Sequence, residues 1–360
     1  MKTLMIVTGG LGTGGLERIS CFIANSFIEK GWKVVILTLL QRTSDSCSFQ
    51  SLNKNIIVKN YDGRQNPLKH KFLAIGTWRK MIKNYTNEFN PDCILAMTFK
   101  IASMVCLFAP KMSNRVTVRE ISDPKSKVRN RIVNLLTEFF CRKVKNIIFQ
   151  THWEKDCYHN TIKNKGVVIP NPLTIDVNVT GSFKEKKMFA LSRLLINQKR
   201  QDILIQAFSI FHKEHPDYSL EIYGKGGDKC TLEKLILKYE CSDFVKILDP
   251  VPNIHAIVRE YRCFVLTSDY EGMSNALLEC YCSGIPCLSS DWPGVEDIVT
   301  NGLDGLIYKR QDIEQLASLM SFVASNDEVC KKMTMNAIQN SERFKSYVVV
   351  PQYCEVIERE

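Results

Sequence analysis

Residues 267–284 read TSDYEGMSNALLECYCSG and follow the apolar run Cys263–Leu266, which is typical of a buried strand. Ser274 is suited to cap a helix, and Gly284 before a proline is typical of a helix end. The stretch therefore predicts a strand, a loop and a helix whose first amides, those of residues 272–275, point outward above the strand's carboxyl end. A helix N-terminus in that position binds anions.

Two carboxylates flank these amides. Glu271 lies in the predicted loop, and Glu279 lies about five residues into the predicted helix, roughly a turn and a half below it. Both acids can reach one ligand that carries a phosphate near the amides and hydroxyls on either side, and a nucleotide sugar fits that description. The alternative is a surface loop before an amphipathic helix with a solvated glutamate.

Length and composition favour a two-domain globular protein. A chain of 360 residues is too long for one ordinary core, and 45% hydrophobic with 24% charged residues is ordinary for a globular protein. The longest apolar candidate, residues 101–110, is far shorter than the ~18 residues of a membrane span. The short apolar run in MKTLMIVTGG predicts no signal peptide, so we expect a cytoplasmic protein.

The 14 cysteines are then expected to be reduced thiols. Cys280, Cys282 and Cys287 form a cluster, but two of them lie on the predicted helix without the usual C-x2-C pairing of a metal site. We expect them to pack as small hydrophobic residues.

Charge is distributed unevenly along the chain. Residues 1–175 hold 27 Lys and Arg against 11 Asp and Glu, a balance of +16, whereas residues 176–360 hold 21 against 27, a balance of −6. A basic half indicates a polyanionic partner, either nucleic acid or an anionic membrane surface. No zinc finger, helix-turn-helix or aromatic-basic RNA signature accompanies it, so we favour the membrane surface.

The N-terminal half opens as a βαβ unit. A strand at residues 4–8, the glycine loop of residues 9–15, a helix ending at Gly31 and a strand at residues 34–39 follow one another. Gly10-x-Gly12-x-x-Gly15 also satisfies the dinucleotide fingerprint, but Gln41 and Arg42 stand where an acid would hold the ribose. An arginine there could serve NADP, so a nicotinamide site is an alternative.

Further strands of this half end near charged residues. The runs 93–97 and 115–118 are followed by Lys100 and by Arg119 and Glu120, and strand carboxyl ends line the ligand crevice of an open α/β sheet. The basic segment 125–145 is either a core-packed helix with a solvated basic face or a helix on a membrane surface.

Four segments are predicted: an N-terminal domain at 1–172, a polar linker at 173–187, a C-terminal domain at 188–345 and a C-terminal helix at 346–360 that returns to the first domain. The second domain has predicted strands at 188–191, 220–223, 245–248, 263–266 and 285–289. A helix is predicted at 202–212, between the first two strands, and further helices alternate with the later ones. This order predicts an α/β fold of two parallel-sheet domains that face one another across a cleft.

Two cations stand at the first strand end of the second domain. Arg193 follows the strand and Lys199 lies six residues later. A guanidinium and an ammonium there can neutralise a diphosphate. For either residue alone a solvated surface cation is the default, but Gly224 and the Glu271 loop lie at strand ends of the same sheet.

Taken together, these motifs resemble the retaining glycosyltransferases of the two-Rossmann-domain (GT-B) type, family GT4. The matching pieces span nearly the whole chain in the family's order: Gly14–Arg18, Gln150–Thr151, Ile169–Pro172, Ala190–Leu194, Lys199 with Asp202–Phe208, Leu220–Gly224, Glu271-Gly272-x6-Glu279 and Gly284–Pro286.

The resemblance implies roles for residues of this sequence. Arg193, Lys199 and Glu271 would be catalytic. The donor nucleotide sugar would be bound by Gly15, Ser192, Arg193, Lys199, Gly224, Glu271, Gly272, Met273, Ser274, Asn275 and Glu279, of which Glu279 would hold the ribose. The acceptor side would include Arg18, Lys100, Arg119 and Glu120. In relatives that act on lipid carriers an arginine stands at the position of Ile121, so acceptor placement rests on fewer matches than donor placement.

The implied activity is transfer of a hexose or N-acetylhexosamine, N-acetylgalactosamine among the candidates, from a UDP-sugar to a lipid-diphosphate-linked saccharide. The enzyme would work in surface polysaccharide assembly, peripherally on the inner face of the plasma membrane. No Asp-x-Asp motif occurs, so we expect neither a metal nor another cofactor.

Three other functions are open. A glycosidase would use the carboxylate pair but has no need of the two cations. A nucleotide-sugar epimerase of the same fold would need no acceptor. A non-catalytic subunit would bind the sugar nucleotide in support of a partner transferase.

Overall fold

The computed structural model describes residues 1–11, 15–40, 52–61, 71–121, 139–173, 185–251 and 257–359, without the side chains of residues 18 and 71–73. The chain forms two compact units. Unit 1 comprises Met1–Thr174 and Phe344–Glu360, and unit 2 comprises Ile175–Arg343. Part of the glycine loop (12–14), Gln41 and Arg42, most of the basic segment (122–138) and most of the linker (174–184) lie outside the described residues.

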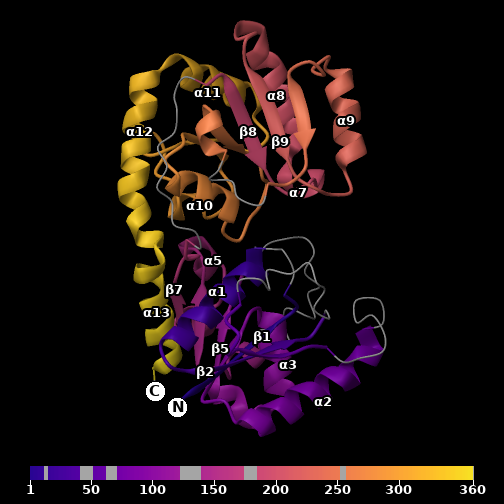
Figure 1. Cartoon of the computed structure of the whole chain (residues 1–360), viewed down its shortest axis with the longest axis vertical. Coiled ribbons are helices and arrows are strands. Elements are labelled where there is room, and N and C mark those ends of the chain that lie inside the picture. Colours follow the sequence, from indigo (N-terminus) through magenta and orange to yellow (C-terminus); the bar gives the residue numbers. More distant parts are fainter. Residues whose placement is uncertain are drawn as a thin grey trace. The chain divides into compact units, whose positions relative to one another are not determined.

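Unit 1 is a parallel seven-stranded sheet in the order β3-β2-β1-β4-β5-β6-β7 (Figure 1). Its strands are β1 (Thr3–Thr8), β2 (Lys33–Thr38), β3 (Ile57–Lys59), β4 (Cys93–Ala96), β5 (Val116–Arg119), β6 (Asn146–Phe149) and β7 (Gly166–Val168). Its helices are α1 (Gly15–Glu29), α2 (Lys71–Phe89), α3 (Phe99–Phe108), η2 (Pro110–Arg115), α5 (His152–Asp156), α6 (Asn160–Lys163) and α13 (Ser346–Glu358).

Both faces of this sheet are buried, which explains why its strands are mostly apolar. Along β1, Met5 and Val7 belong to one hydrophobic cluster, whereas Leu4 and Ile6 belong to another. Helices α2 and α3 supply the first cluster, and α1 and α13 supply the second. Alternate side chains of a strand point to opposite faces, so a sheet covered on both sides needs an apolar residue at every position.

The C-terminal helix α13 is part of the core of unit 1 (Figure 1). Tyr353 and Ile357 of this helix are fully buried, and the thiol of Cys93 in β4 donates to the carbonyl of Ile357 at 3.1 Å. The chain returns to unit 1 just before this helix, where the amide of Leu173 donates to the carbonyl of Phe344 at 2.7 Å. Unit 2 therefore ends at Arg343, two residues before the predicted end at 345.

Unit 2 is a parallel six-stranded sheet in the order β10-β9-β8-β11-β12-β13. Its strands are β8 (Lys187–Leu191), β9 (Ser219–Tyr223), β10 (Val245–Leu248), β11 (Cys263–Leu266), β12 (Cys287–Ser290) and β13 (Leu306–Tyr308). Its helices are α7 (Ile196–Lys199), α8 (Gln201–Glu214), α9 (Lys229–Lys238), η4 (Val258–Glu260), α10 (Asn275–Cys282), η5 (Val295–Asp297), α11 (Ile313–Ser325), α12 (Asp327–Asn340) and η6 (Ser341–Phe344), the last of which reaches unit 1.

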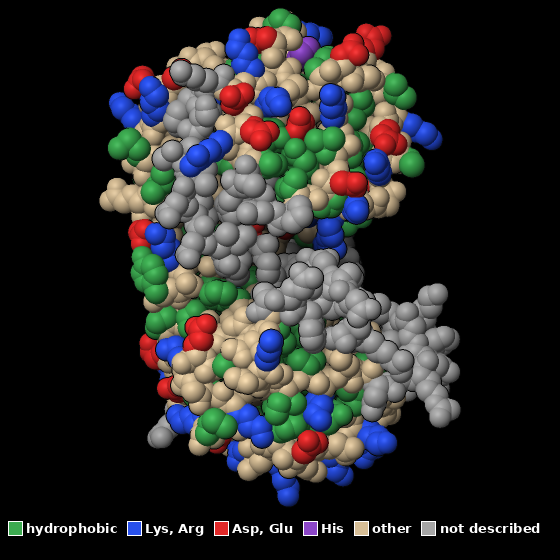
Figure 2. Space-filling model, in the orientation of Figure 1, with side chains coloured by type: hydrophobic (Ala, Val, Ile, Leu, Met, Phe, Trp, Pro, Cys, Tyr) green, Lys and Arg blue, Asp and Glu red, His purple; other side chains and the backbone are tan. Residues whose placement is uncertain are grey.

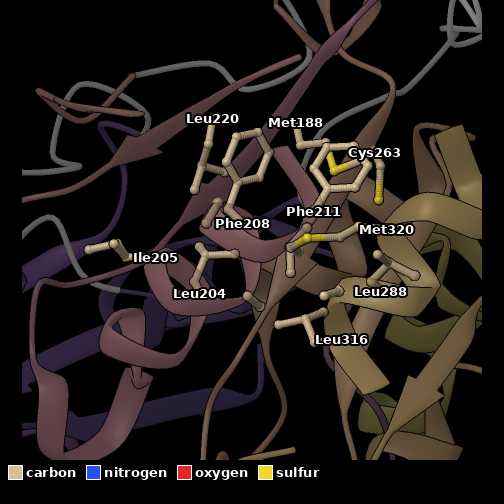
Figure 3. Close-up of a cluster of buried hydrophobic side chains, with 14 of the residues drawn as sticks. Met188, Leu204, Ile205, Phe208, Phe211, Leu220, Cys263, Leu288, Leu316 and Met320 are labelled. Carbon is tan, nitrogen blue, oxygen red and sulfur yellow. The ribbon is translucent and has the colours of Figure 1, made fainter. Parts of the chain in front are cut away.

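One face of this sheet packs against α8 and α11 in a cluster of buried side chains (Figure 3). Phe208 and Phe211 of α8 and Leu316 and Met320 of α11 meet Leu288 and other strand residues there. All five of these side chains are at most 1% exposed. This packing fixes the sheet, and with it the strand ends from which the polar loops leave.

The predicted α/β fold of two parallel-sheet domains is confirmed. Predicted strand limits agree within two residues, since continuous apolar runs mark doubly covered strands clearly. No helix within the described ranges combines the length and the apolar character needed to cross a membrane.

Candidate functional site

The strand order of unit 2 reverses between β8 and β11, which are neighbours in the sheet although β9 and β10 lie between them in the sequence. In open α/β sheets, ligands bind outside the strand carboxyl ends at such a switch point. Residues 192–199 leave β8 there, and residues 267–274 leave β11. The two loops that carry the predicted catalytic residues are thus brought together.

The predicted helix N-terminus is present. Ser274 has extended backbone angles, and its hydroxyl accepts a hydrogen bond from the amide of Leu277 at 3.3 Å, so it caps α10. The first amides of a helix have no partner within it and carry partial positive charge, which favours an anion. Ser274 and Met273 are buried, while Gly272 is half-buried.

Lys199 and Glu271 form an ion pair. The Nζ of Lys199 lies 2.5 Å from the Oε1 of Glu271, and the two side chains are only 12% and 9% exposed. The hydroxyl of Ser268 donates to the same carboxylate oxygen at 2.6 Å. A buried ion pair loses hydration on both sides, and this extra hydrogen bond offsets part of that cost.

Several hydrogen bonds join the loops that carry this pair. Thr267 Oγ1 donates to the carbonyl of Lys199 at 2.6 Å, and the amide of Asp269 donates to the carbonyl of Gln198 at 2.8 Å. The side-chain amide of Gln198 donates to the carbonyl of Tyr270 at 3.2 Å. The turn before α8 and the loop before α10 therefore form one hydrogen-bonded substructure.

Arg193 is exposed at the end of β8, and its guanidinium has no hydrogen bond or ion pair within the described part of the chain. Its carbonyl accepts from the side-chain amide of Gln201 at 2.8 Å, and the same amide donates to the hydroxyl of Ser192 at 2.8 Å. The backbone around Arg193 is thus fixed while its cation is free to meet an anion.

Glycines at the end of β9 allow the neighbouring loop to pass closely. A Cβ atom at Gly224 would lie 2.0 Å from the carbonyl oxygen of Ser192, and one at Gly226 would lie 2.1 Å from the carbonyl oxygen of Leu194. Only glycine fits at these two positions, since real Cβ atoms do not approach carbonyls so closely.

Glu279, the predicted ribose ligand, lies on α10 and is 7% exposed.

Cys280, which follows Glu279, and the strand residue Cys287 are free buried thiols. Burial raises the pKa of both thiols well above its usual value, so both stay protonated and pack as apolar residues.

The predicted acceptor residues all lie in unit 1. Lys100 is exposed in the first turn of α3. Glu120 is buried, and its Oε2 accepts from the amide of Phe99 at the start of α3 at 3.3 Å. The side chain of Arg18 lies outside the described residues, while Gly15, the predicted donor contact in unit 1, begins α1.

Arg119 is fully buried within unit 1. Its Nε donates to the hydroxyl of Tyr353 at 2.8 Å, and its Nη2 donates to the side chain of Asn171. Gln150 donates to the same Asn171 oxygen at 2.9 Å. These bonds tie α13 and the end of β6 to β5, and an acceptor role for Arg119 stays a prediction.

A polar network beside Lys199 was missed by sequence reasoning. Arg200 follows Lys199, forms two hydrogen bonds of 3.0 Å with Asp202 and donates to Asp269 at 3.1 Å. Hydrogen bonds with Asp202 first, and then with Asp269, raise the pKa of the Arg200 guanidinium above its already high usual value. A basic residue between two predicted elements gives no sign of these partners in the sequence.

The chain is similar to known glycosyltransferases. The family model described as glycosyl transferases group 1 matches residues 174–340. An uncharacterized glycosyltransferase of Haemophilus influenzae is 20% identical and covers 98% of this chain and 99% of its own length. The amylovoran biosynthesis glycosyltransferase AmsD of Erwinia amylovora is 21% identical over 99% of each chain.

The protein is a glycosyltransferase, and its residues 174–340 match the group 1 family.

Solved structures place the glycosyltransferase in the same fold. Anabaena HepE, in a crystal structure with UDP and glucose, superimposes with a TM-score of 0.83 over 100% of both chains at 15% identity. The predicted GT-B fold is thereby confirmed.

The close passage at Gly224 gives a test that needs no ligand. Gly224→Ala should destabilise the glycosyltransferase by about 1–3 kcal/mol, because the added Cβ forces the Ser192 backbone to move. Thermal or urea unfolding measures this loss. Gly227→Ala is the matched control, since a Cβ at Gly227 would meet nothing within 4 Å. Equal stability of the two variants would contradict the close passage.

Proposed function

We propose that this glycosyltransferase is a retaining enzyme of the GT4 family that moves a hexose or N-acetylhexosamine from a UDP-sugar to a lipid-diphosphate-linked saccharide. The observation that carries the proposal is the grouping of Arg193, Lys199, Glu271 and the N-terminus of α10 at the switch point of one sheet. Two cations and a helix N-terminus suit a diphosphate, and Glu271 suits sugar hydroxyls.

The names of similar proteins support the substrate classes. HepE was solved with UDP and glucose, which supports a uridine-nucleotide donor. AmsD is named for amylovoran biosynthesis, which supports a role in surface polysaccharide assembly. The sugar itself is left to experiment, because selectivity among hexoses depends on a few hydroxyl contacts.

In the proposed reaction the bond between the anomeric carbon and the diphosphate breaks, and a bond from the acceptor oxygen to the same face of that carbon forms. The acceptor proton passes to the departing phosphate oxygen, so UDP leaves and the anomeric configuration is retained. Arg193, Lys199 and the α10 amides stabilise the charge that develops on the diphosphate. Glu271 orients the sugar and does not attack it, and no metal is assigned to the step.

Lys199→Ala should lower turnover about 100- to 1,000-fold, because removing one donor to a developing anion typically has that effect. Release of UDP from a panel of UDP-sugars, with and without lipid-linked acceptor, measures turnover. Lys225→Ala is the control, since this lysine is 75% exposed at a neighbouring strand end. Unchanged turnover in Lys199→Ala would remove Lys199 from the reaction, and turnover that never responds to an acceptor would favour an epimerase.

Glu279→Ala should weaken UDP binding about 10- to 100-fold, as expected when a charged hydrogen-bond acceptor for the ribose is lost. Isothermal titration calorimetry with UDP gives the dissociation constant. Glu296→Ala removes an exposed glutamate of unit 2 and should leave the dissociation constant unchanged. An unaltered affinity in Glu279→Ala would count against the ribose assignment.

We further propose that unit 1 meets an anionic membrane at the inner face of the plasma membrane. Residues 1–175 carry the +16 balance, and Figure 2 shows Lys and Arg outnumbering acidic side chains on the visible face of unit 1. Leu107 and Phe139 are each 54% exposed, and the ammonium of Lys143 lies 5.0 Å from the ring centroid of Phe139. Exposed apolar side chains beside cations are typical of membrane-surface contacts.

The protein should therefore bind vesicles that contain phosphatidylserine and release them as salt rises, because charges are screened over ~8 Å at physiological ionic strength. Neutralising Arg142 and Lys143 with glutamine should weaken binding about 30-fold, at roughly 1 kcal/mol per basic residue. Vesicle co-sedimentation measures this. Glutamine at Lys234 and Lys238 of unit 2 is the charge-matched control. Vesicle binding that changes neither with salt nor in the Arg142/Lys143 variant would refute the proposal.

A further inference from the structure

Three segments of unit 2 converge on the side chain and backbone of Asp269. These segments are the turn 198–202 before and at the start of α8, the loop 267–271 after β11, and residues 309–312 after β13. Asp269 is not among the residues that the proposed donor site uses. Its side chain is 23% exposed and is therefore only partly in solvent.

Every polar group of Asp269 is engaged. Its amide donates to the carbonyl of Gln198 at 2.8 Å, and its carbonyl accepts from Nη1 of Arg310 at 2.9 Å. Its Oδ2 accepts from Nη1 of Arg200 at 3.1 Å. The side-chain amide of Gln311 reaches both carboxylate oxygens, at 3.1 and 3.2 Å.

Two of the partners adopt a backbone conformation that side chains disfavour. Arg200 has φ of 51° and Gln311 has φ of 67°, both in the left-handed region where glycine is usual. Arg200 lies between α7 and α8, directly after Lys199. These conformations persist when surrounding contacts determine them, and Asp269 is a contact that the two residues share.

We propose that Asp269 is a positioning residue of the donor site. It holds the turn that carries Lys199 against the loop that carries Glu271, and it anchors both to the segment after β13. This inference rests on the proposed function, because a shift of Lys199 and Glu271 affects turnover only if these residues take part in the reaction.

The carboxylate is required because both of its oxygens accept hydrogen bonds. Asparagine at this position would keep the shape and one acceptor oxygen, but its NH2 group would face a donor of Arg200 or Gln311. Asp269→Asn therefore loses the hydrogen bond to either Arg200 or Gln311, while the hydrophobic core is unchanged. The turn and the loop can then shift relative to each other.

The test compares wild type, Asp269→Asn and Asp291→Asn. Asp291 is the matched control: it accepts from the amide and Nε of Arg310 at 2.8 and 3.0 Å, and in the described part of the chain it has no hydrogen bond to 198–202 or 269–271. For Asp269→Asn we expect kcat for UDP-sugar hydrolysis to fall about 10- to 100-fold, as small misplacements of catalytic groups do. UDP affinity by calorimetry should change less than about threefold, because Arg193, Glu279 and the α10 amides are retained.

A second variant covers the case in which Asp269→Asn is unstable. Gln311→Gly removes one partner of Asp269 and relieves the left-handed conformation, so the fold is kept. Like Asp269→Asn, it should lower kcat and leave UDP affinity unchanged. If instead either variant loses kcat, UDP affinity and thermal stability in parallel, the effect is general unfolding and the proposal is overturned.

The outcomes separate this inference from the function on which it rests. A wild-type protein that does not bind UDP overturns the donor assignment, and the role of Asp269 falls with it. A wild type that binds and hydrolyses while Asp269→Asn behaves like Asp291→Asn overturns the role of Asp269 alone. A selective loss of kcat in Asp269→Asn supports both.

Discussion

The ion pair of Lys199 and Glu271 joins the loops that leave β8 and β11 at the carboxyl edge of the sheet of unit 2. The two residues leave different strands, β8 and β11, which lie side by side only because the strand order reverses there. A pair that is 12% and 9% exposed is costly to desolvate, and breaking one partner of such a pair typically costs ~3–5 kcal/mol. The hydrogen bond from Ser268 offsets part of this cost, and the contacts of Thr267 and Gln198 hold the two loops together.

The sequence allowed the sheets and the strand-end residues to be predicted, and the physical reason is the same for both. A strand buried on two faces is mostly apolar, as Leu4 to Val7 show, and such a run is visible without an alignment. Polar residues that follow the run then lie at the ligand edge of the sheet. Arg193, Lys199 and Glu271 were predicted in this way, and the structure places them after β8 and β11.

What could not be predicted are the contacts between loops. Asp269 stands between a strand and a helix in the sequence, and nothing in its neighbourhood indicates that Arg200 and Gln311, 69 and 42 positions away, share its carboxylate. Nor does a position at a strand end determine exposure. Arg119 is the last residue of β5 and Arg193 lies just after β8, yet Arg119 is fully buried and bonded to Tyr353 of α13.

Arg119 and Arg193 both lie at the carboxyl end of a parallel strand, but one is buried in the structure and the other is exposed. In unit 1 the returning helix α13 and Asn171 cover the end of β5, so the cation there helps to join distant parts of the chain. In unit 2 the glycines after β9 let the backbone pass closely beside residues 192–194, and the Arg193 side chain stays exposed. A cation that the fold buries and hydrogen-bonds stabilises structure, whereas an exposed cation at a strand end is available to an anionic ligand. For these two arginines, burial and hydrogen bonding decide more than the position at a strand end whether the cation can meet an anion.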